Sequence, residues 1–410
     1  MDSNLTQYFN MKSLYTIIDE SLEQDMKLSS EDKKYLLKLD DEYDKLSEPF
    51  WREVTHFQNI VDVHSNIVEF KKSYKEDKPY TPHLKYEESK FKSDEYTKKF
   101  VKKCNDLINK FMEFPQCYLS HLYIQEIRKI RGLGEFYNKF THDPTIVDGW
   151  YFRRPSKKTY EEALKMYKEH PFKNPKDLAK GDKDYEKNQK APDCISIMQK
   201  EIDKQGYAWK AECDDNLIPR MSVKTYNKFV IRTSREFSKV DLNSLMVHEI
   251  NTHVRRKHLG NQTGLKLFLY GVGHADDLDE GMALRNSLEK LDKQKPNILF
   301  YVSQKIIINY WIGRKTFTEI FDFLKKITPN YDEDQLLYAL HRNHRCTFYS
   351  TERDLSYNFD TAYFEGYQVV KDLSEAECEW LMHYNIGIAA MHEIPNIKKF
   401  FKVNKFDPVK

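Results

Sequence analysis

The chain has 410 residues, of which 40% are apolar and 32% are charged, and its formal net charge at pH 7 is +2. This length allows two domains or one large one, and the composition is that of an ordinary globular protein. A charge so near zero argues against a protein that coats a polyanion, and the sequence carries no nucleic-acid-binding motif, so we expect no nucleic-acid partner.

Cysteine spacing, the N-terminus and the apolar runs bear on the cellular compartment. Six cysteines are scattered without a Cys-x-x-Cys pair, which predicts reduced structural thiols in a cytoplasmic protein. The first twenty residues are too polar for a signal peptide. The most apolar run, from Ile298 to Ile312, is shorter than a membrane span and contains Gln304 and Lys305. We interpret it as a buried helix and expect no membrane-spanning segment.

Helical periodicity dominates the N-terminal third. Residues 1–60 mix acidic, basic and apolar positions at helical spacing and predict two or three amphipathic helices. Residues 66–86 read as an irregular, aromatic-rich strap over the core. Residues 87–137 return to helical spacing until Gly132 and Gly134 interrupt it. Residues 138–193 are the least regular part, and within them residues 157–191 predict short surface helices and loops.

The pattern changes to β after a short helix predicted for residues 194–205. Residues 220–223 and 228–232 are β-branched and alternating, with a turn between them, and predict two strands. A helix is predicted next, because apolar residues recur at helical spacing from residue 242 and Ser238 with Asp241 gives a start signal of the Ser-x-x-Asp type.

This helix carries His248, Glu249 and His253 in the pattern His-Glu-x-x-x-His. In zinc peptidases two histidines of one helix bind the metal, and the glutamate beside the first acts as a base toward water. Positions four apart on a regular helix lie about 40° apart around the axis, but positions five apart lie about 140° apart. A π-bulge at Asn251 and Thr252 would return both histidines to one face. The alternative is a regular helix with two solvated histidines.

A zinc peptidase also needs a third protein ligand and an open fourth position. Glu280, near the head of the apolar segment 278–288, has suitable chemistry. Asp279, His258 and His274 are the alternatives.

At this point the sequence resembles a known family. HEINTHV followed by DEGMA is similar to the HEIGTHV…EEGLA or QEGLA pair of a metallopeptidase family that contains microtubule-associated tyrosine carboxypeptidases and bacterial QEGLA-motif proteins. The resemblance implies zinc as the cofactor, held by His248, His253 and Glu280, with Glu249 as the catalytic base. It leaves Asp279 as a flanking residue that supports a ligand or caps the helix.

The strand before the zinc helix has a recurrent use in zinc peptidases. Substrate can lie antiparallel along the free edge of such a strand, so that main-chain hydrogen bonds hold its backbone. By this analogy we predict that Phe229, Val230 and Ile231 bind the substrate.

Three more helices are predicted over residues 298–313, 317–327 and 333–343, and a closing helix over residues 375–397. Residues 341–367 resemble a third block of the family, R-x-x-R-G…TKD-x-x-Y-x-x-G. The positions that fit are Arg342, Arg345, Asp360, Tyr363 and Gly366.

Two arginines and a tyrosine suit a carboxypeptidase. Guanidinium groups can grip a terminal carboxylate, and a tyrosine hydroxyl can donate to an oxyanion, so Arg342, Arg345 and Tyr363 are predicted to bind substrate. The alternative is that the arginines neutralise acidic neighbours or cap helices. His341 and His344 are expected to be ordinary surface or interface histidines.

The sequence departs from the family pattern in a few places. Asn251 stands where HEIGTH has Gly, and Cys346 stands where Gly follows the second arginine. Asn358 and Phe359 replace the Thr and Lys of TKD. These changes bear more on the substrate end of the site than on the metal end.

The expected fold is α+β and mostly helical. Residues 146–410 are expected to form a zincin-like metallopeptidase core with a small β-sheet and a Lys-rich irregular insertion near 157–190. An N-terminal helical region, residues 1–145, is expected to pack on it.

The resemblance implies a zinc metallocarboxypeptidase that acts on a protein or peptide with a free C-terminus. Its eukaryotic precedent is removal of tyrosine from the tail of tubulin, in a cytoplasmic, cytoskeleton-associated protein. Two alternatives are a zinc endopeptidase or peptide-processing enzyme, and a non-catalytic interaction protein with a vestigial site.

Overall fold

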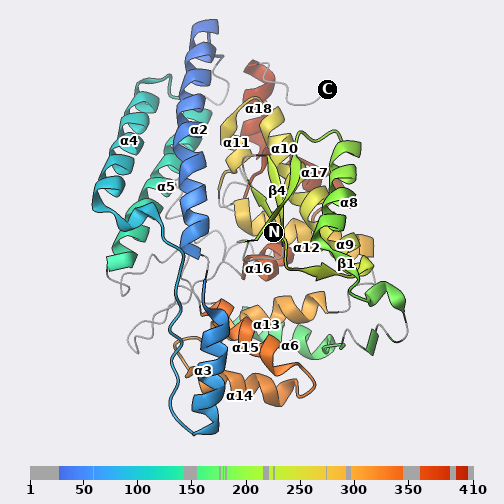
Figure 1. Cartoon of the computed structure of the whole chain (residues 1–410). Coiled ribbons are helices and arrows are strands. Elements are labelled where there is room, and N and C mark those ends of the chain that lie inside the picture. Colours follow the sequence, from blue (N-terminus) through green and yellow to red (C-terminus); the bar gives the residue numbers. More distant parts are fainter. Residues whose placement is uncertain are drawn as a thin grey trace.

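The computed structural model describes residues 27–58, 60–142, 155–174, 177–178, 180, 182–215, 221–224, 227–273, 275–291, 297–344, 361–387 and 394–404. In this part of the chain, helices predominate and the strands are few and short (Figure 1). The predicted mostly helical α+β class is therefore confirmed.

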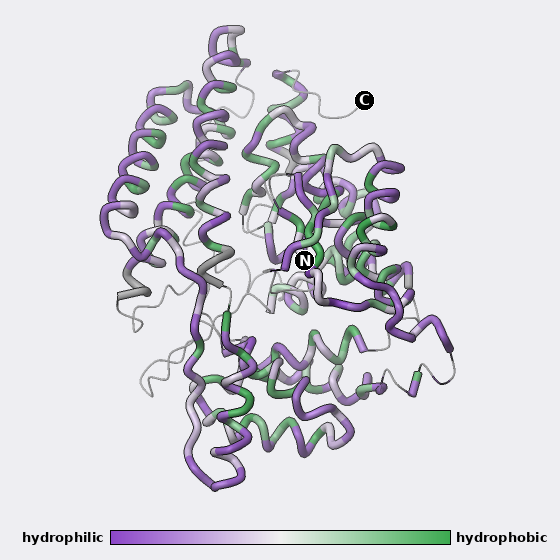
Figure 2. Tube along the Cα trace, viewed as in Figure 1, coloured by the Kyte–Doolittle hydropathy of each residue, from purple (hydrophilic) through white to green (hydrophobic). Residues whose placement is uncertain are grey.

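A bundle of long helices stands at one side of the molecule (Figure 1). It consists of α2 (Ser30–Gln58), α4 (Asp94–Glu113) and α5 (Tyr118–His142). Polar and apolar residues alternate along these helices (Figure 2), and their apolar sides form one buried cluster. Gly134 lies within α5 and does not interrupt it. A Cβ atom there would come within 2.9 Å of the rings of Phe91 and Phe100, so the glycine lets both rings pack against the helix.

A second group of helices surrounds a separate apolar cluster. It consists of α3 (Val63–Lys75), α6 (Lys157–Glu169), α13 (Ile298–Trp311), α14 (Phe317–Ile327) and α15 (Glu333–Asn343). The predicted bounds of α14 and α15 are confirmed. The prediction of an irregular strip from residue 66 is wrong at its start, because α3 continues to Lys75. α6 is not purely a surface helix, since Ala163 and Tyr167 are buried against this cluster.

The strands form two small sheets. In the larger one, β4 (Lys228–Arg232) lies between β2 (Lys210–Asp214), which is parallel to it, and β3 (Met221–Lys224), which is antiparallel. β1 (Gln189–Lys190) and β5 (Glu236–Phe237) pair separately. The predicted strands β3 and β4 are confirmed, and β2 is an addition.

The remaining helices are α8 (Ala191–Lys204), α9 (Lys239–Leu245), the π-helix η4 (Met246–Val254), α10 (Arg255–Gln262), α11 (Lys266–Tyr270), α12 (Ala275–Leu291), α16 (Ala362–Val370), α17 (Glu375–Tyr384) and α18 (Ile394–Asn404). Among them, α8 packs against β2 and β4, η4 contacts β3, and α12 packs against η4 and α16. α9 begins at the predicted Ser238–Asp241 capping box. The predicted closing helix is wrong in extent: α17 ends at Tyr384, because Asn385 adopts a left-handed conformation with φ 45° and ψ 50°.

The helical bundle is hydrogen-bonded to the segment between η4 and α12. The carboxylate of Asp40 on α2 accepts hydrogen bonds from the backbone N–H groups of Lys266, at 2.8 Å, and Leu267, at 3.3 Å. Glu126 on α5 accepts a hydrogen bond from the N–H of Gly273, at 2.9 Å. Because these bonds hold α11 and the approach to α12, the bundle helps to fix the start of the helix that carries Glu280.

Within the described residues, no helix combines the length and the apolar character that crossing a membrane requires. The described cysteines are free, as expected from their spacing. They are Cys104, Cys117, Cys194, Cys213 and Cys378. Cys346 lies outside the described residues.

Candidate metal centre

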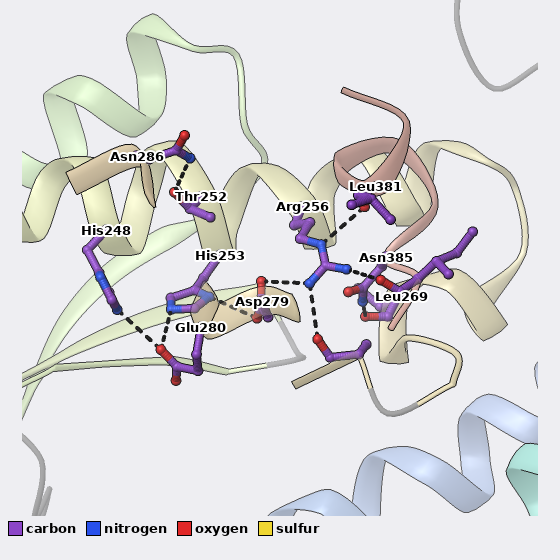
Figure 3. Close-up of polar contacts among 12 residues, drawn as sticks. His248, Thr252, His253, Arg256, Leu269, Asp279, Glu280, Asn286, Leu381 and Asn385 are labelled. Carbon is purple, nitrogen blue, oxygen red and sulfur yellow. Dashed lines mark hydrogen bonds and ion pairs between the residues drawn. The ribbon is translucent and has the colours of Figure 1, made fainter. Parts of the chain in front are cut away.

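A π-helical segment brings the two histidines to one side of the chain. η4 covers nine residues and continues directly from α9 into α10. The N–H of Arg255 donates to the carbonyl of Ile250, five positions back. The Thr252 hydroxyl donates to the carbonyl of Val247 at 3.0 Å and accepts a hydrogen bond from Asn286 at 2.8 Å (Figure 3). The predicted π-bulge is confirmed, and it extends over the whole His-Glu-x-x-x-His pattern.

His248, His253 and Glu280 converge on one point (Figure 3). Nε2 of His248 lies 3.3 Å from Oε2 of Glu280, and Nε2 of His253 lies 3.5 Å from the same oxygen. The three candidate ligand atoms all lie within 4.8 Å of one another. The two imidazole rings are nearly perpendicular, with centroids 5.0 Å apart. These residues therefore form a possible metal-binding triad.

The dimensions of the triad fit a zinc ion. Ligand atoms bound to tetrahedral zinc at about 2.0–2.1 Å lie about 3.3 Å apart, which is close to the two separations from Glu280. Oε2 of Glu280 is buried and has no well-aligned hydrogen-bond partner. A buried carboxylate oxygen without such a partner is costly unless a cation satisfies it. Two imidazoles and one carboxylate are also a donor set that zinc accepts readily.

The alternative third ligands occupy other positions. Oδ2 of Asp279 lies 2.8 Å from Nδ1 of His253, on the side of the ring away from Nε2. His258, on α10, contacts Gln262 at 2.9 Å. His274 lies outside the described residues. Of the three candidates that the structure describes, Glu280 is the one that joins the two histidines.

The two glutamates of the site differ in their electrostatics. Burial raises the pKa of both carboxyl groups, but the neighbouring His253 and His248 outweigh it at Glu280 and lower its pKa to about 2. At Glu249 burial prevails, and the pKa is raised. Burial lowers the pKa of His253, yet the carboxylates of Asp279 and Glu280 outweigh burial and raise that pKa well above its ordinary value. The surroundings of Glu280 therefore favour its ionised form, whereas those of Glu249 make it the better proton acceptor.

Tyr363 is the predicted substrate residue that the structure brings to the cluster. Its ring is nearly parallel to that of His248, with the centroids 6.1 Å apart. Nζ of Lys305 on α13 lies 3.7 Å from the centroid of the Tyr363 ring, within the range of a cation–π interaction. The sequence reasoning did not assign Lys305 to the site. The sequence feature that could have indicated Lys305 is its charge within an otherwise apolar helix.

A close crossing of α12 and α16 sets the position of Tyr363. A Cβ atom on Gly366 would lie 1.9 Å from the carbonyl oxygen of Asp277, and one on Gly281 would lie 2.2 Å from the carbonyl carbon of Gly366. The backbones therefore touch where both residues lack a side chain. Since Gly281 directly follows Glu280, this contact also positions the third candidate ligand.

Other predicted substrate residues are placed differently. Arg342 is half-buried in the last turn of α15, whose contacts run to α3, α13 and α14. Arg345 and Asp360 lie outside the described residues. Carboxylate binding by Arg342 and Arg345 stays a prediction.

The predicted substrate-binding edge at Phe229, Val230 and Ile231 is wrong. β4 is the central strand and pairs with β2 on one side and β3 on the other, so it offers no free edge to a peptide. All three side chains are buried. The unpredicted strand β2 is the cause of the error. β3, an edge strand of this sheet, contacts η4.

His341 and His344 differ from expectation as well. Both are buried, with 0% and 1% of their surfaces exposed. Nδ1 of each ring lies 2.7 Å from the backbone carbonyl oxygen four residues earlier. They belong to the packing of α15 rather than to an exposed surface.

The fold and the cluster define a class of protein. It is a mostly helical α+β protein in which a π-helix and a following α-helix build a possible His-His-Glu metal centre, with a glutamate beside the first histidine. The sequence model of the microtubule-associated tyrosine carboxypeptidase family matches residues 69–404, and the chain belongs to this family. No curated protein matches the sequence significantly. Membership places the chain in a family of carboxypeptidases, which are hydrolytic enzymes.

Proposed function

We propose that this protein is a zinc-dependent metallocarboxypeptidase that removes the C-terminal residue of a protein or peptide. The observation that carries the proposal is the convergence of His248, His253 and Glu280 beside Glu249. Membership of a carboxypeptidase family supports the same reaction class.

The reaction needs a metal, a base and an acid. His248 and His253 would hold zinc through Nε2, and Glu280 through Oε2. When bound, zinc supplies Lewis-acid polarisation of water and of the scissile carbonyl. Glu249 takes the proton from the attacking water and returns it to the leaving amine nitrogen. Its raised pKa favours this role, because a base whose pKa is nearer to neutrality can also give the proton back.

The substrate end needs a donor for the oxyanion and a cation for the terminal carboxylate. We assign the first role to the hydroxyl of Tyr363, since its ring lies beside that of His248. We assign the second to Lys305, together with Arg342 and Arg345. The edge of β3, which packs against η4, replaces β4 as the strand to which a substrate backbone can pair.

The description of the family names tyrosine as the residue removed and describes its members as associated with microtubules. The first substrate that we propose is therefore a tubulin-like tail that ends in tyrosine, and a cytoplasmic, cytoskeleton-associated location follows from it. Lys305 favours a substrate with a free carboxylate over one with a blocked end, because an amide cannot offer the same charge.

The test combines metal content with end-blocked substrates. We expect about one zinc per chain by elemental analysis, and cleavage of peptides with a free C-terminus that is lost when the terminus is amidated. Equal cleavage of amidated peptides would favour the endopeptidase alternative. A protein that takes up no zinc and cleaves neither kind of peptide would be an interaction protein instead.

A further inference from the structure

A fully buried arginine lies behind the metal centre. Arg256, three residues after His253, has 0% of its surface exposed. Its Nε donates to the carbonyl of Leu381 at 3.1 Å, one terminal nitrogen donates to the carbonyl of Ala275 at 3.2 Å, and the other donates to the carbonyl of Ile386 at 2.5 Å (Figure 3). The guanidinium therefore connects α10 to the start of α12 and to the end of α17.

The same guanidinium contacts the carboxylate that faces a ligand histidine. Nη1 of Arg256 lies 3.2 Å from Oδ1 of Asp279, and Oδ2 of Asp279 lies 2.8 Å from Nδ1 of His253. The contact with Arg256 is an ion pair, and the contact with His253 is a close approach of the carboxylate to the ring nitrogen.

This arrangement selects one state of the His253 ring. A carboxylate beside Nδ1 attracts a proton on that nitrogen and repels a lone pair there. With zinc at the triad, the ring would then carry its proton on Nδ1 and present the lone pair of Nε2 to the metal beside Glu280. We infer that Arg256 is a positioning residue, which acts through Asp279 to fix the orientation and tautomer of His253 and so raises the affinity of the site for zinc.

The chemistry requires arginine at this position. Its planar guanidinium presents five N–H donors in a fixed fork, and here it contacts three carbonyls and one carboxylate at once. A lysine ammonium has three donors at a single point and cannot span these partners. The C-terminal segment therefore supports the metal centre without contributing a ligand to it.

The inference rests on the proposed function, and its test is zinc affinity measured by competition with a chromophoric chelator. We expect Arg256→Lys and Asp279→Asn each to weaken zinc binding about 10- to 100-fold, the usual effect of losing a partner of a metal ligand. The matched control is Arg255→Lys, since Arg255 pairs with Glu379 at the surface and should leave the affinity within about twofold of wild type.

A double variant separates positioning from general destabilisation. If Arg256 acts through Asp279, adding Arg256→Lys to Asp279→Asn should weaken zinc binding no further. Nitrogen-15 NMR of labelled histidine in the zinc-loaded wild type, with the His253 signal assigned from its loss in His253→Gln, should show His253 protonated on Nδ1 and this signal altered in Asp279→Asn.

The outcomes are distinguishable. Wild-type zinc affinity in folded Asp279→Asn would overturn the inference, as would fully additive losses in the double variant. If Arg256→Lys fails to fold, Asp279→Asn and its NMR signal decide alone. A wild-type protein that binds no zinc would instead contradict the proposed function itself.

Discussion

Two glutamates of the same site are assigned opposite tasks by their surroundings. Glu280 faces both imidazoles, and the favourable interaction with them outweighs the cost of burial. Glu249 lies in the same helical segment as both histidines, but burial dominates its pKa. The amino-acid type is identical, so the difference comes from which charges each carboxylate faces. One is suited to bind a cation and the other to exchange a proton.

The corresponding prediction compares two variants. Glu249→Gln should keep zinc near the wild-type level but lower peptide turnover by at least about 100-fold, the usual contribution of a general base. Glu280→Ala should lose zinc as well as activity, because it removes one of three ligands. Elemental analysis and peptide hydrolysis measured on the same samples would check both. Undiminished hydrolysis by Glu249→Gln would remove Glu249 from the mechanism.

At the scale of elements, the site depends on two backbone features. The π-helix η4 corrects the spacing of His248 and His253, which a regular helix would place on different faces. The crossing of α12 and α16 brings Glu280 and Tyr363 toward that pair. A crossing this close requires glycine on both helices, and Gly281 and Gly366 supply it.

Gly366→Ala tests the crossing. The added Cβ would lie 1.9 Å from a backbone oxygen of α12, so the helices must separate and Glu280 must move with them. We expect a loss of stability of about 1–3 kcal/mol, together with weaker zinc binding. Chemical denaturation and chelator competition would measure the two effects.

Gly132→Ala is the matched control for this prediction. Gly132 lies within α5, and a Cβ atom there meets nothing within 4 Å. That substitution should stabilise the protein by about 0.5–1 kcal/mol, because it favours the helix. If Gly366→Ala behaves like Gly132→Ala, the crossing does not control the metal centre.

At the scale of the whole molecule, buried polar groups join parts of the chain that are distant in sequence. Asp40 of the bundle accepts a hydrogen bond from the backbone of α11, and Arg256 donates one to the backbone of α17. Nε2 of His341 lies 2.9 Å from the hydroxyl of Tyr80. Groups buried in this way make the stability of the fold depend on pH. Burial lowers the pKa of His341 to about 4 and that of His344 to about 3.

The sign of the His344 effect follows from these shifts. The unfolded chain takes up a proton on this residue below about pH 6.5, and the folded chain does so only near pH 3, so stability is lost as the pH falls between these values. Relative to His344→Gln, the wild-type protein should lose about 1.4 kcal/mol of unfolding free energy per pH unit from about pH 6 to pH 4.

Urea denaturation of both proteins at several pH values would measure this difference. His64→Gln, on the exposed side of α3, is the control and should track the wild type. A constant gap between wild type and His344→Gln across this range would show that His344 titrates normally in the folded state.

Local spacing in the sequence determined the elements and the chemistry. The bounds of α14 and α15, the capping box of α9 and the need for a π-bulge follow from contacts within a few residues, which periodicity encodes directly. The identities of the histidines and the adjacent glutamate follow in the same way. The proposed third ligand, Glu280, came from the DEGMA pattern rather than from spacing.

Only the tertiary structure decided which surfaces meet. Periodicity shows that a strand or helix has a buried face but not what covers it. β2, which the sequence did not predict, pairs with the edge of β4 that was expected to be free, and Phe229, Val230 and Ile231 are buried. Lys305 reaches the site because α13 packs against α16. Arg256 becomes important through carbonyls more than 120 residues away, at separations of 125 and 130 positions. Long-range pairs of this kind leave no periodic trace in the sequence, because each partner satisfies only its own local pattern.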